Sequence, residues 1–311
     1  ARASGHPWVL AEYTGMCITR SCKSGVIMAT IGRIESVTDF INLVAKVSKR
    51  STSIHTFRGQ RDSEWLDNPG LLRANSKLLA HEYNAIRDLQ SIHPQEFHQD
   101  INMFDRLVRM QHYGLPTRLM DVSSNPLVAL FFATEPYRSK LREIDGRVIV
   151  YDVPKSRRKY FDSDSVSCVA NLANLVDDEK QELFSNQGLP IEDFNKLRSC
   201  DRLVQFIRAE KPHFRPLINP KDLAKGFYVT PKMQNSRIIA QHGAFIIFGL
   251  KVVRVQGPGK SENTIARTMI DIPQSAKAQI RRELDGLGIN ASTLFPELSH
   301  AASEIVRRYS Q

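Results

Sequence analysis

Three short segments of the sequence place strongly hydrogen-bonding side chains beside a glycine. They are Phe57-Arg58-Gly59-Gln60, the run QHYGLPTRLMD from Gln111 to Asp121, and the run RIIAQHGAF from Arg237 to Phe245. An arginine at a strand end offers a planar fork of donors to a phosphate or carboxylate, and a neighbouring glycine lets a ligand approach the backbone. The three segments therefore predict a polar cleft that binds an anion.

Arg58 also has a purely structural interpretation, and both alternatives stay open. Its guanidinium could form a stabilising ion pair with a carboxylate such as Asp121 without touching any ligand. Arg118 and Asp121 stand three residues apart on a predicted strand. Their side chains should face opposite sides of the sheet, so we expect at most one of them to share a cleft with Arg58.

Two histidines, His112 and His242, each follow a glutamine. Imidazole titrates near neutral pH, so either could act as an acid or base, although histidines at the ends of elements are commonly structural. No carboxylate or cysteine stands at ligand spacing near them, and we expect no metal. Cys17, Cys22, Cys168 and Cys200 form no C-x-x-C pair, which favours reduced thiols. Neither a nucleophile-elbow nor a P-loop pattern occurs in the sequence.

Apolar periodicity and turn residues predict the elements that position these segments. The expected helices are 37–49, 76–92, 95–113, a buried helix from 126, 275–284 and 299–309, with a mostly helical stretch over 164–210. The expected strands are 53–59, 117–122, 146–153, 227–230, 237–240, 245–255 and 265–272. Ser36 and Asn125 stand at helix starts as caps, and Gly114 and Pro116 end the helix before them.

These elements predict an α+β fold with an antiparallel or mixed sheet core, a helical N-terminal part and a helical insertion around 160–215. Residues 1–27 lack periodicity and are expected to be an extension that need not be native. The main domain is expected over 28–298, followed by a C-terminal helix over 299–311.

Composition places the chain among soluble globular proteins. Hydrophobic residues make up 41% and charged residues 24% of the sequence, and no apolar run is long enough to cross a bilayer. The first residues lack the apolar core of a secretory signal, so we expect a cytoplasmic protein without membrane contact. The net charge of +10 favours a polyanionic partner such as nucleic acid, but the basic residues are scattered, and solubility alone is the alternative.

The segments F-R-G-Q, Q-H-Y-G-L-P-T-R-L-M-D and N-P-L-V-A-L-F-F-A together resemble the FRG-domain family, which is widespread in bacteria and phages. The resemblance continues through R-I-I-A-Q-H-G-A-F and G-I-N-A-S-T-L-F-P, and it spans roughly residues 34–298. The family pattern has an aromatic-Thr pair after the aspartate, where this chain has Val122-Ser123. The resemblance therefore implies the family's fold and cleft, with the hydroxyl kept at Ser123 and the aromatic contact in doubt.

A looser similarity connects the order of elements to ADP-ribosyltransferases of the Arg, Ser-Thr-Ser, Glu type. It implies NAD as a substrate, with Arg58 in the place of the arginine that holds NAD and the stretch from Asp121 to Ser124 in the place of the hydroxyl-rich strand. Such enzymes carry a catalytic glutamate on a late strand, where this chain offers Gln234, Arg237 and Gln241. Either another acid such as Asp121 replaces it, or the transferase chemistry is absent.

The leading hypothesis is an ADP-ribosyltransferase-like enzyme that acts as a bacterial toxin or anti-phage effector, with RNA or DNA as the acceptor and an antitoxin protein as a partner. Its expected catalytic residues are Asp121, Ser123 and Gln241. The residues expected to bind NAD are Arg58, Gly59, Gln60, Gln111, His112, Tyr113 and Arg118, and those expected to bind the acceptor are Arg237 and His242. The alternative is a non-catalytic module that binds nucleotides or nucleic acid. A nuclease would need clustered carboxylates, whereas those of this sequence are scattered.

Overall fold

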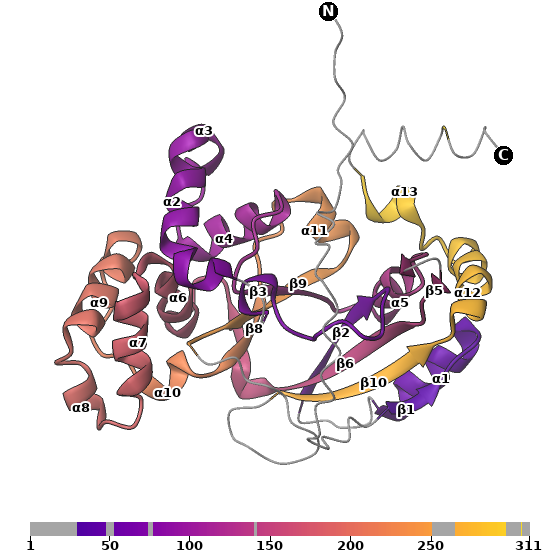
Figure 1. Cartoon of the computed structure of the whole chain (residues 1–311), viewed down its shortest axis with the longest axis horizontal. Coiled ribbons are helices and arrows are strands. Elements are labelled where there is room, and N and C mark those ends of the chain that lie inside the picture. The colour runs from indigo at the N-terminus through magenta and orange to yellow at the C-terminus, as the bar shows by residue number, and fades with distance from the viewer. Residues whose placement is uncertain are drawn as a thin grey trace, which may run out of the picture.

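A mixed sheet forms the centre of the computed structural model, which describes residues 30–47, 53–73, 77–139, 142–250, 265–296 and 306 (Figure 1). The strand order of this 8-stranded sheet is β1-β10-β6-β2-β3-β9-β8-β7. Its strands are β1 (Thr30–Arg33), β2 (Ser53–Gln60), β3 (Leu119–Ser123), β6 (Gly146–Pro154), β7 (Arg158–Tyr160), β8 (Gly226–Thr230), β9 (Gly243–Phe248) and β10 (Ala266–Ile272). The pairs β1·β10 and β7·β8 at the two edges are parallel, and the inner pairs are antiparallel. The predicted α+β class with a mixed sheet is confirmed.

Helices gather at the two ends of this sheet (Figure 1). At one end are α2 (Glu82–Ile92), α3 (Pro94–Phe97), α4 (Met103–His112), α6 (Asp164–Asn171), α7 (Asp177–Ser185), α8 (Ile191–Phe194), α9 (Arg198–Glu210) and α10 (Pro220–Leu223). Toward the other end are α1 (Val37–Val47), α5 (Pro126–Ala133), α12 (Gln274–Gly286) and α13 (Ala291–Leu294), with α11 (Ser236–Ala240) between the groups. A separate hairpin pairs β4 (Arg138–Ser139) with β5 (Arg142–Glu143). The helical stretch predicted over 164–210 is confirmed as α6 to α9.

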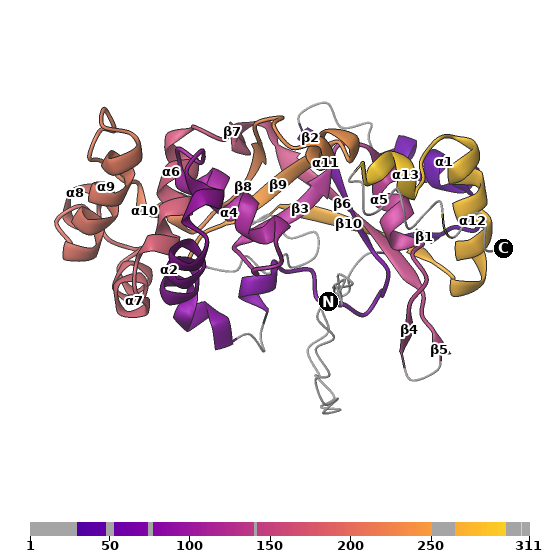
Figure 2. The ribbon, with the colours of Figure 1, turned by 90° about the horizontal axis from the view of Figure 1, so that it is seen from above.

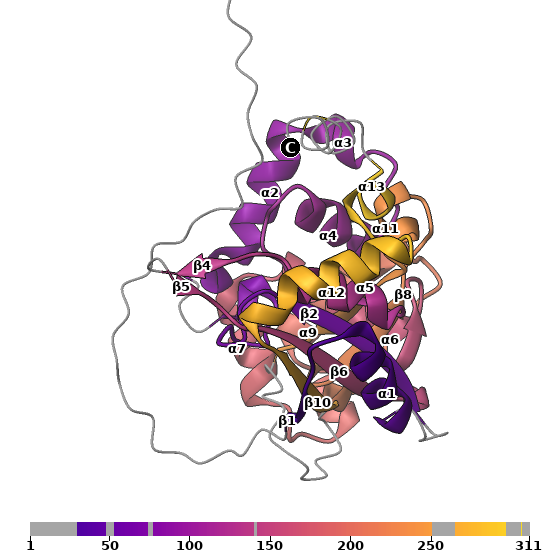
Figure 3. The same cartoon turned by 90° about the vertical axis from the view of Figure 1, so that its right-hand side faces the viewer.

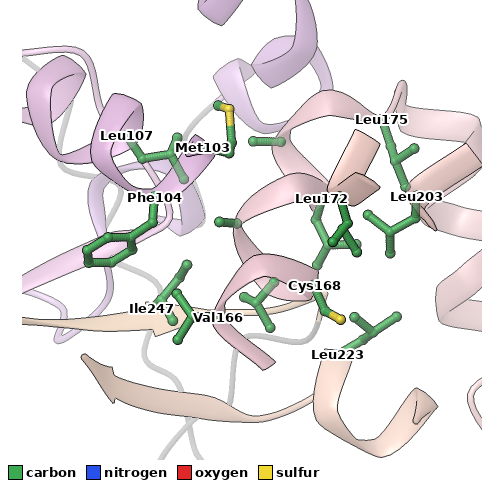
Figure 4. Close-up of a cluster of buried hydrophobic side chains, with 14 of the residues drawn as sticks. Met103, Phe104, Leu107, Val166, Cys168, Leu172, Leu175, Leu203, Leu223 and Ile247 are labelled. Atoms are coloured by element: carbon green, nitrogen blue, oxygen red, sulfur yellow. The ribbon is translucent and has the colours of Figure 1, made fainter. Parts of the chain in front are cut away.

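Two hydrophobic clusters share one face of the sheet without merging. The first packs α4, α6 and α9 on β3, β8 and β9, and Figure 4 shows part of it around Leu107, Val166 and Ile247. The second packs α1, α5 and α12 on β2, β6 and β10, as the end-on view in Figure 3 shows. Phe57 of β2 lies directly opposite Ser123 of β3, which puts the two clusters on the same face. A third cluster, around Met120 and Tyr151, covers the opposite face.

The local signals for helix ends are confirmed. Ser36 Oγ accepts a hydrogen bond from the backbone N–H of Asp39 at 3.1 Å and donates to its carboxylate at 2.8 Å, which begins α1. The Asn125 side chain accepts from Leu127 N–H at 2.9 Å at the start of α5. Gly114 follows α4 with φ +93, a left-handed conformation that favours glycine.

Two predicted elements differ because asparagine caps override the apolar pattern. The helix predicted over 95–113 is divided into α3 and α4, since Asn102 accepts from Asp105 N–H at 2.8 Å and starts a new helix. The strand predicted over 237–240 is wrong: the Asn235 side chain accepts from Arg237 N–H at 2.8 Å and Ile238 N–H at 3.4 Å, so this segment is α11.

Some predictions lie outside the described residues. These are the extension over 1–27, the part of the 245–255 strand beyond residue 250, and the helix over 299–309 apart from Val306, which is helical.

Gly59 is where α5 packs against β2. A Cβ at this position would lie 1.9 Å from Ala129 O and 2.7 Å from Ala133 N, both backbone atoms of α5. The expectation that Gly59 lets a ligand approach the backbone is therefore wrong, because a helix fills that space.

Replacing Gly59 with alanine is expected to destabilise the fold by about 3 kcal/mol or more, since the backbone of α5 would have to move. The measurement is the free energy of unfolding from denaturant titration. Gly188→Ala is the control: a Cβ there meets nothing within 4 Å, so its effect should stay within about 1 kcal/mol. Equal stability of the two variants would contradict this account of the β2–α5 contact.

Candidate functional site

The sheet divides between β2 and β3. β2 pairs with β6 from Ser53 to Gln60, and β3 pairs with β9 from Leu119 to Ser123. Between β2 and β3, both fully described, the single register pair is Phe57 with Ser123. Residues 58–60 of β2 and 119–122 of β3 therefore do not pair with each other in the sheet. We call this opening between the two strands the β2–β3 junction.

Arg58 reaches across the β2–β3 junction with its side chain. Its Nη1 donates to the backbone carbonyl of Asp121 at 2.7 Å. Two residues earlier on β2, Thr56 Oγ1 donates to the backbone carbonyl of Ser123 at 3.0 Å. Side-chain donors thus replace ladder bonds that the divided sheet lacks. The ion pair between Arg58 and the Asp121 carboxylate, one of the two alternatives from sequence, is not what the structure contains. The Arg58 Nε is buried and has no hydrogen-bond partner within the described ranges.

Asp121 is the exposed residue of an otherwise buried strand. Gln111 Nε2 of α4 donates to Asp121 Oδ2 at 2.7 Å, while Gln111 Oε1 accepts from Thr117 Oγ1 at 2.5 Å. The hydroxyl and the carboxylate together fix the orientation of the amide. Sequence reasoning missed Thr117, although it lies in the same run as Gln111 and Asp121, where a hydroxyl beside an amide and an acid was the available signal.

A polar strip separates the two hydrophobic clusters on this face. Asp121 and Ser123 alternate with the buried Val122 along β3, so both point to the face that carries the two clusters. Seen from above, β3 runs between α4 on one side and α5 on the other (Figure 2). The carboxylate of Asp121 is therefore held at the middle of the sheet, where the two clusters do not meet.

Ser123 and the turn before β9 are linked by hydrogen bonds to the protein backbone. Ser123 is buried; its Oγ donates to Gln241 O at 2.8 Å and accepts from Asn125 N–H at 3.0 Å. His242, with φ +48, presents its carbonyl to the N–H of Ser124 at 3.0 Å. Gln241 Nε2 donates to Leu294 O at 3.1 Å, which ties this turn to α13. The expected hydroxyl and amide of the site are thus engaged with the protein backbone.

The remaining predicted residues differ in their contacts and burial. The Arg237 guanidinium lies over the Phe295 ring at 4.8 Å from its centroid. The rings of His112 and Tyr113 meet edge to face at 5.2 Å, and the Tyr113 side chain is 49% exposed. Gln60 is only 4% exposed, and its Oε1 has no hydrogen-bond partner among the described residues.

Arg118 does not belong to this site. It is 1% exposed and pairs with Glu82 of α2, with Nε–Oε1 at 2.9 Å and Nη2–Oε2 at 2.5 Å, and its Nη1 donates to Phe248 O at 3.0 Å. Lys180 of α7 joins the same carboxylate at 2.8 Å. Arg118 and Asp121 therefore face opposite sides, as expected, and the predicted contact of Arg118 with NAD is replaced by a buried ion cluster.

The structure also bears on metal and thiol chemistry. Among the described residues, no group of three or more His, Cys, Asp or Glu side chains is placed to hold a metal ion.

Cys168 and Cys200 are free and buried, and burial raises the pKa of Cys200 to about 12, so this thiol is protonated at neutral pH. None of the described helices is long and apolar enough to cross a membrane.

Comparison with known proteins assigns part of the chain to a family. Residues 53–141 match the family model described as the FRG domain. This range runs from β2 through α4 and β3 to α5, so it contains Arg58, Gln111 and Asp121. Neither the curated proteins nor the solved structures include a match to the chain. The chain therefore contains an FRG domain over residues 53–141.

Proposed function

We propose that this protein transfers ADP-ribose from NAD to a macromolecular acceptor at the β2–β3 junction. The observation that carries the proposal is that Arg58 and Asp121 meet at this opening of the sheet: the Arg58 guanidinium, which leaves β2 on one face, bonds the backbone carbonyl of Asp121 at 2.7 Å, and the Asp121 carboxylate is exposed on the other face. A substrate that contacts both groups would therefore span the opening between β2 and β3. A guanidinium with N–H groups that have no partner in the protein can donate to the oxygens of a diphosphate. A carboxylate held in place can stabilise the positive charge that develops on the ribose in the transition state.

Asp121 takes the place of the glutamate that related transferases carry on a late strand. In the proposed step, the bond between C1′ of the ribose and the nicotinamide nitrogen breaks, and its electron pair leaves with nicotinamide. The Asp121 carboxylate stabilises the positive charge that develops on the ribose, and an acceptor oxygen or nitrogen bonds to C1′ and loses its proton to solvent or to Asp121. Gln111 acts as a positioning residue, because its amide holds Asp121 Oδ2.

The other predicted residues receive narrower roles. Tyr113, half exposed beside His112, is the aromatic side chain available to pack on a ring of the substrate. Ser123 and Gln241 shape the turn that borders the site, since each already bonds a backbone carbonyl. Arg237 and His242 would face the acceptor. RNA or DNA is the favoured acceptor because of the net charge of +10, and a role as toxin or anti-phage effector, with an antitoxin partner, follows from the bacterial and phage setting of the family.

A second candidate function is a module that binds nucleotides or nucleic acid without turnover. The observation in its favour is that α11 replaces the expected late strand, and β9 carries no acidic side chain. Such a module would need Arg58 but not the charge of Asp121.

The decisive test is incubation of the purified protein with NAD labelled in the adenylate part, followed by separation of RNA, DNA and protein fractions. Label in one fraction, together with release of nicotinamide, is the expected result. A folded sample that binds NAD but releases no nicotinamide and labels no fraction would reject the transferase and leave the binding module.

Arg58→Lys is expected to raise the KM for NAD about ten-fold or more, with a smaller change in kcat. Lysine keeps the charge but loses the fork that can bond Asp121 O and a phosphate oxygen together. The measurement is the initial rate of nicotinamide release against NAD concentration. Arg138→Lys on the β4–β5 hairpin, where the side chain is 74% exposed, is the control and should leave both constants unchanged. An unchanged KM in Arg58→Lys would remove Arg58 from the NAD site.

A further inference from the structure

A second arginine, Arg73, follows a segment that packs on the face of the sheet opposite the two hydrophobic clusters, the face on which Arg58 leaves β2. Phe57 belongs to the second cluster, so alternation along β2 places the side chain of Arg58 on the other face, beside Ile149 of β6. Ile149 belongs to the third cluster, which also contains Leu72 and Met120. Arg58 thus leaves β2 at this cluster and reaches the edge of β3.

Arg73 approaches the same edge of β3 from the segment that follows β2. A 3-10 helix over Gly70–Leu72 runs beside the start of β3, where Leu71 N–H donates to Thr117 O at 3.3 Å. Leu72 is buried in the third cluster with Met120, the neighbour of Asp121. Arg73 follows immediately and is exposed.

The two arginines repel each other. Burial lowers the pKa of Arg73, and the positive charge of Arg58 lowers it further. Within the described ranges no carboxylate forms an ion pair with either of them. The aspartate of this face, Asp67, is already engaged, since it pairs with Arg267 at 2.5 Å and accepts a hydrogen bond from Tyr151. The residues after Arg73 are Ala74, Asn75 and Ser76, which add no acid.

Two guanidinium groups that face each other without a carboxylate repel, and an anion between them would remove that repulsion. Arg58 has a buried Nε without a described partner, and its Nη1 is fixed on Asp121 O. One guanidinium is therefore held in place by the backbone and the other is open to solvent. This arrangement fits an anion with several oxygens, which can accept from both forks.

We propose that Arg58 and Arg73 bind the oxygens of a diphosphate together, so that Arg73 is a second ligand of the substrate anion. That this diphosphate belongs to NAD rests on the proposed function. The site itself would also accept the diphosphate of a free nucleotide.

The test uses ADP, which carries the diphosphate without nicotinamide, and adenosine, which lacks phosphate. Calorimetric titration should show that the full chain binds ADP and that Arg73→Ala weakens this binding about ten-fold to a hundred-fold, while the weaker binding of adenosine stays the same in both proteins. Arg73→Lys should recover part of the affinity for ADP, since it restores the charge but not the fork. Arg138→Ala is the control for loss of a surface charge and should bind ADP as the unmodified protein does.

Thermal melting separates a ligand role from a structural one. Without ADP, Arg73→Ala should melt at the same temperature as the unmodified protein or higher, because the repulsion with Arg58 is removed. With ADP, the melting temperature should rise more in the unmodified protein than in the variant. A lower melting temperature of the variant without ADP, or equal affinity of both proteins for ADP, would overturn the proposal, as would a failure of the unmodified protein to bind ADP.

The transferase and the diphosphate site can fail independently, and the experiments separate the two outcomes. Binding of ADP that depends on Arg73, without nicotinamide release from NAD, would keep the diphosphate site and reject the transferase. Turnover of NAD that is unaffected by Arg73→Ala at low NAD concentration would keep the transferase and reject Arg73 as a ligand.

Discussion

Asp121→Asn is expected to lower the rate of nicotinamide release from NAD by about 10² to 10³-fold while NAD still binds with nearly unchanged affinity. The asparagine has almost the same shape, and its oxygen can still accept from Gln111 Nε2, which bonds Asp121 Oδ2 at 2.7 Å. What it lacks is the negative charge that would stabilise the ribose in the transition state. The fold should be retained, because Asp121 is exposed.

The measurement combines a rate assay with a binding titration on the same samples. Asp88→Asn, at an exposed position of α2, is the matched control and should keep the full rate. A rate in Asp121→Asn within a few-fold of the unmodified protein would remove Asp121 from catalysis. If Asp121→Asn lost affinity for NAD as well as rate, Asp121 would instead have a role in binding NAD.

Glu82→Gln is expected to reduce the free energy of unfolding by about 3–5 kcal/mol. Glu82 is 2% exposed and bonds both Arg118 and Lys180, which are themselves buried. Without its charge, two cations remain in the interior with no carboxylate between them. Total stabilities of folded domains are only about 5–15 kcal/mol, so this loss is a large part of the whole.

The same cluster predicts how stability depends on pH. Burial opposes ionisation of Glu82, but attraction to Arg118 and Lys180 and the hydrogen bonds from both outweigh it, and the pKa of Glu82 lies below its ordinary value. A carboxyl whose pKa is lowered by folding stabilises the protein above its unfolded pKa, and this contribution is lost as the pH falls toward the folded pKa. Glu82→Gln should therefore lose less stability on acidification below the ordinary carboxyl pKa of about 4.3.

Denaturant titration at neutral and acidic pH measures both effects. Glu192→Gln, on the exposed surface of α8, is the control and should change stability by less than about 0.5 kcal/mol. If Glu82→Gln were as stable as this control, the ion cluster would contribute nothing to the fold.

The elements of the fold were largely readable from the sequence because their signals are local. Alternation of apolar residues predicted β2, β-rich runs predicted β6, β8 and β10, and side-chain caps such as Ser36 and Asn125 predicted where helices begin. Capping acts between residues a few positions apart, so no knowledge of the rest of the chain is needed. The strand predicted over 237–240 is wrong for a reason that is also local: Asn235 caps a helix there, and its hydrogen bond to Arg237 N–H overrides the apolar run that follows.

The candidate site was predicted only in part. The sequence indicated that Arg58, Gln111 and Asp121 belong to one polar site, and the structure joins both residues to Asp121: Arg58 bonds its backbone carbonyl and Gln111 bonds its carboxylate. Alternation along the predicted strand placed Arg118 and Asp121 on opposite faces, but it did not indicate which of the two belongs to the site. Only the packing of α2 and α7, which bring Glu82 and Lys180 to Arg118, decides that it is buried.

The sequence by itself determined the α+β class, most helix ends and the polar residues around which a site is built. Only the tertiary structure decided that the sheet opens between β2 and β3, that α5 rather than a ligand fills the space beside Gly59, and that the segment before Arg73 packs on the face where Arg58 leaves β2. The physical reason is the range of the interactions involved. Propensity, periodicity and capping act within one element, whereas strand register, close backbone packing and repulsion between charges depend on which segments meet in space.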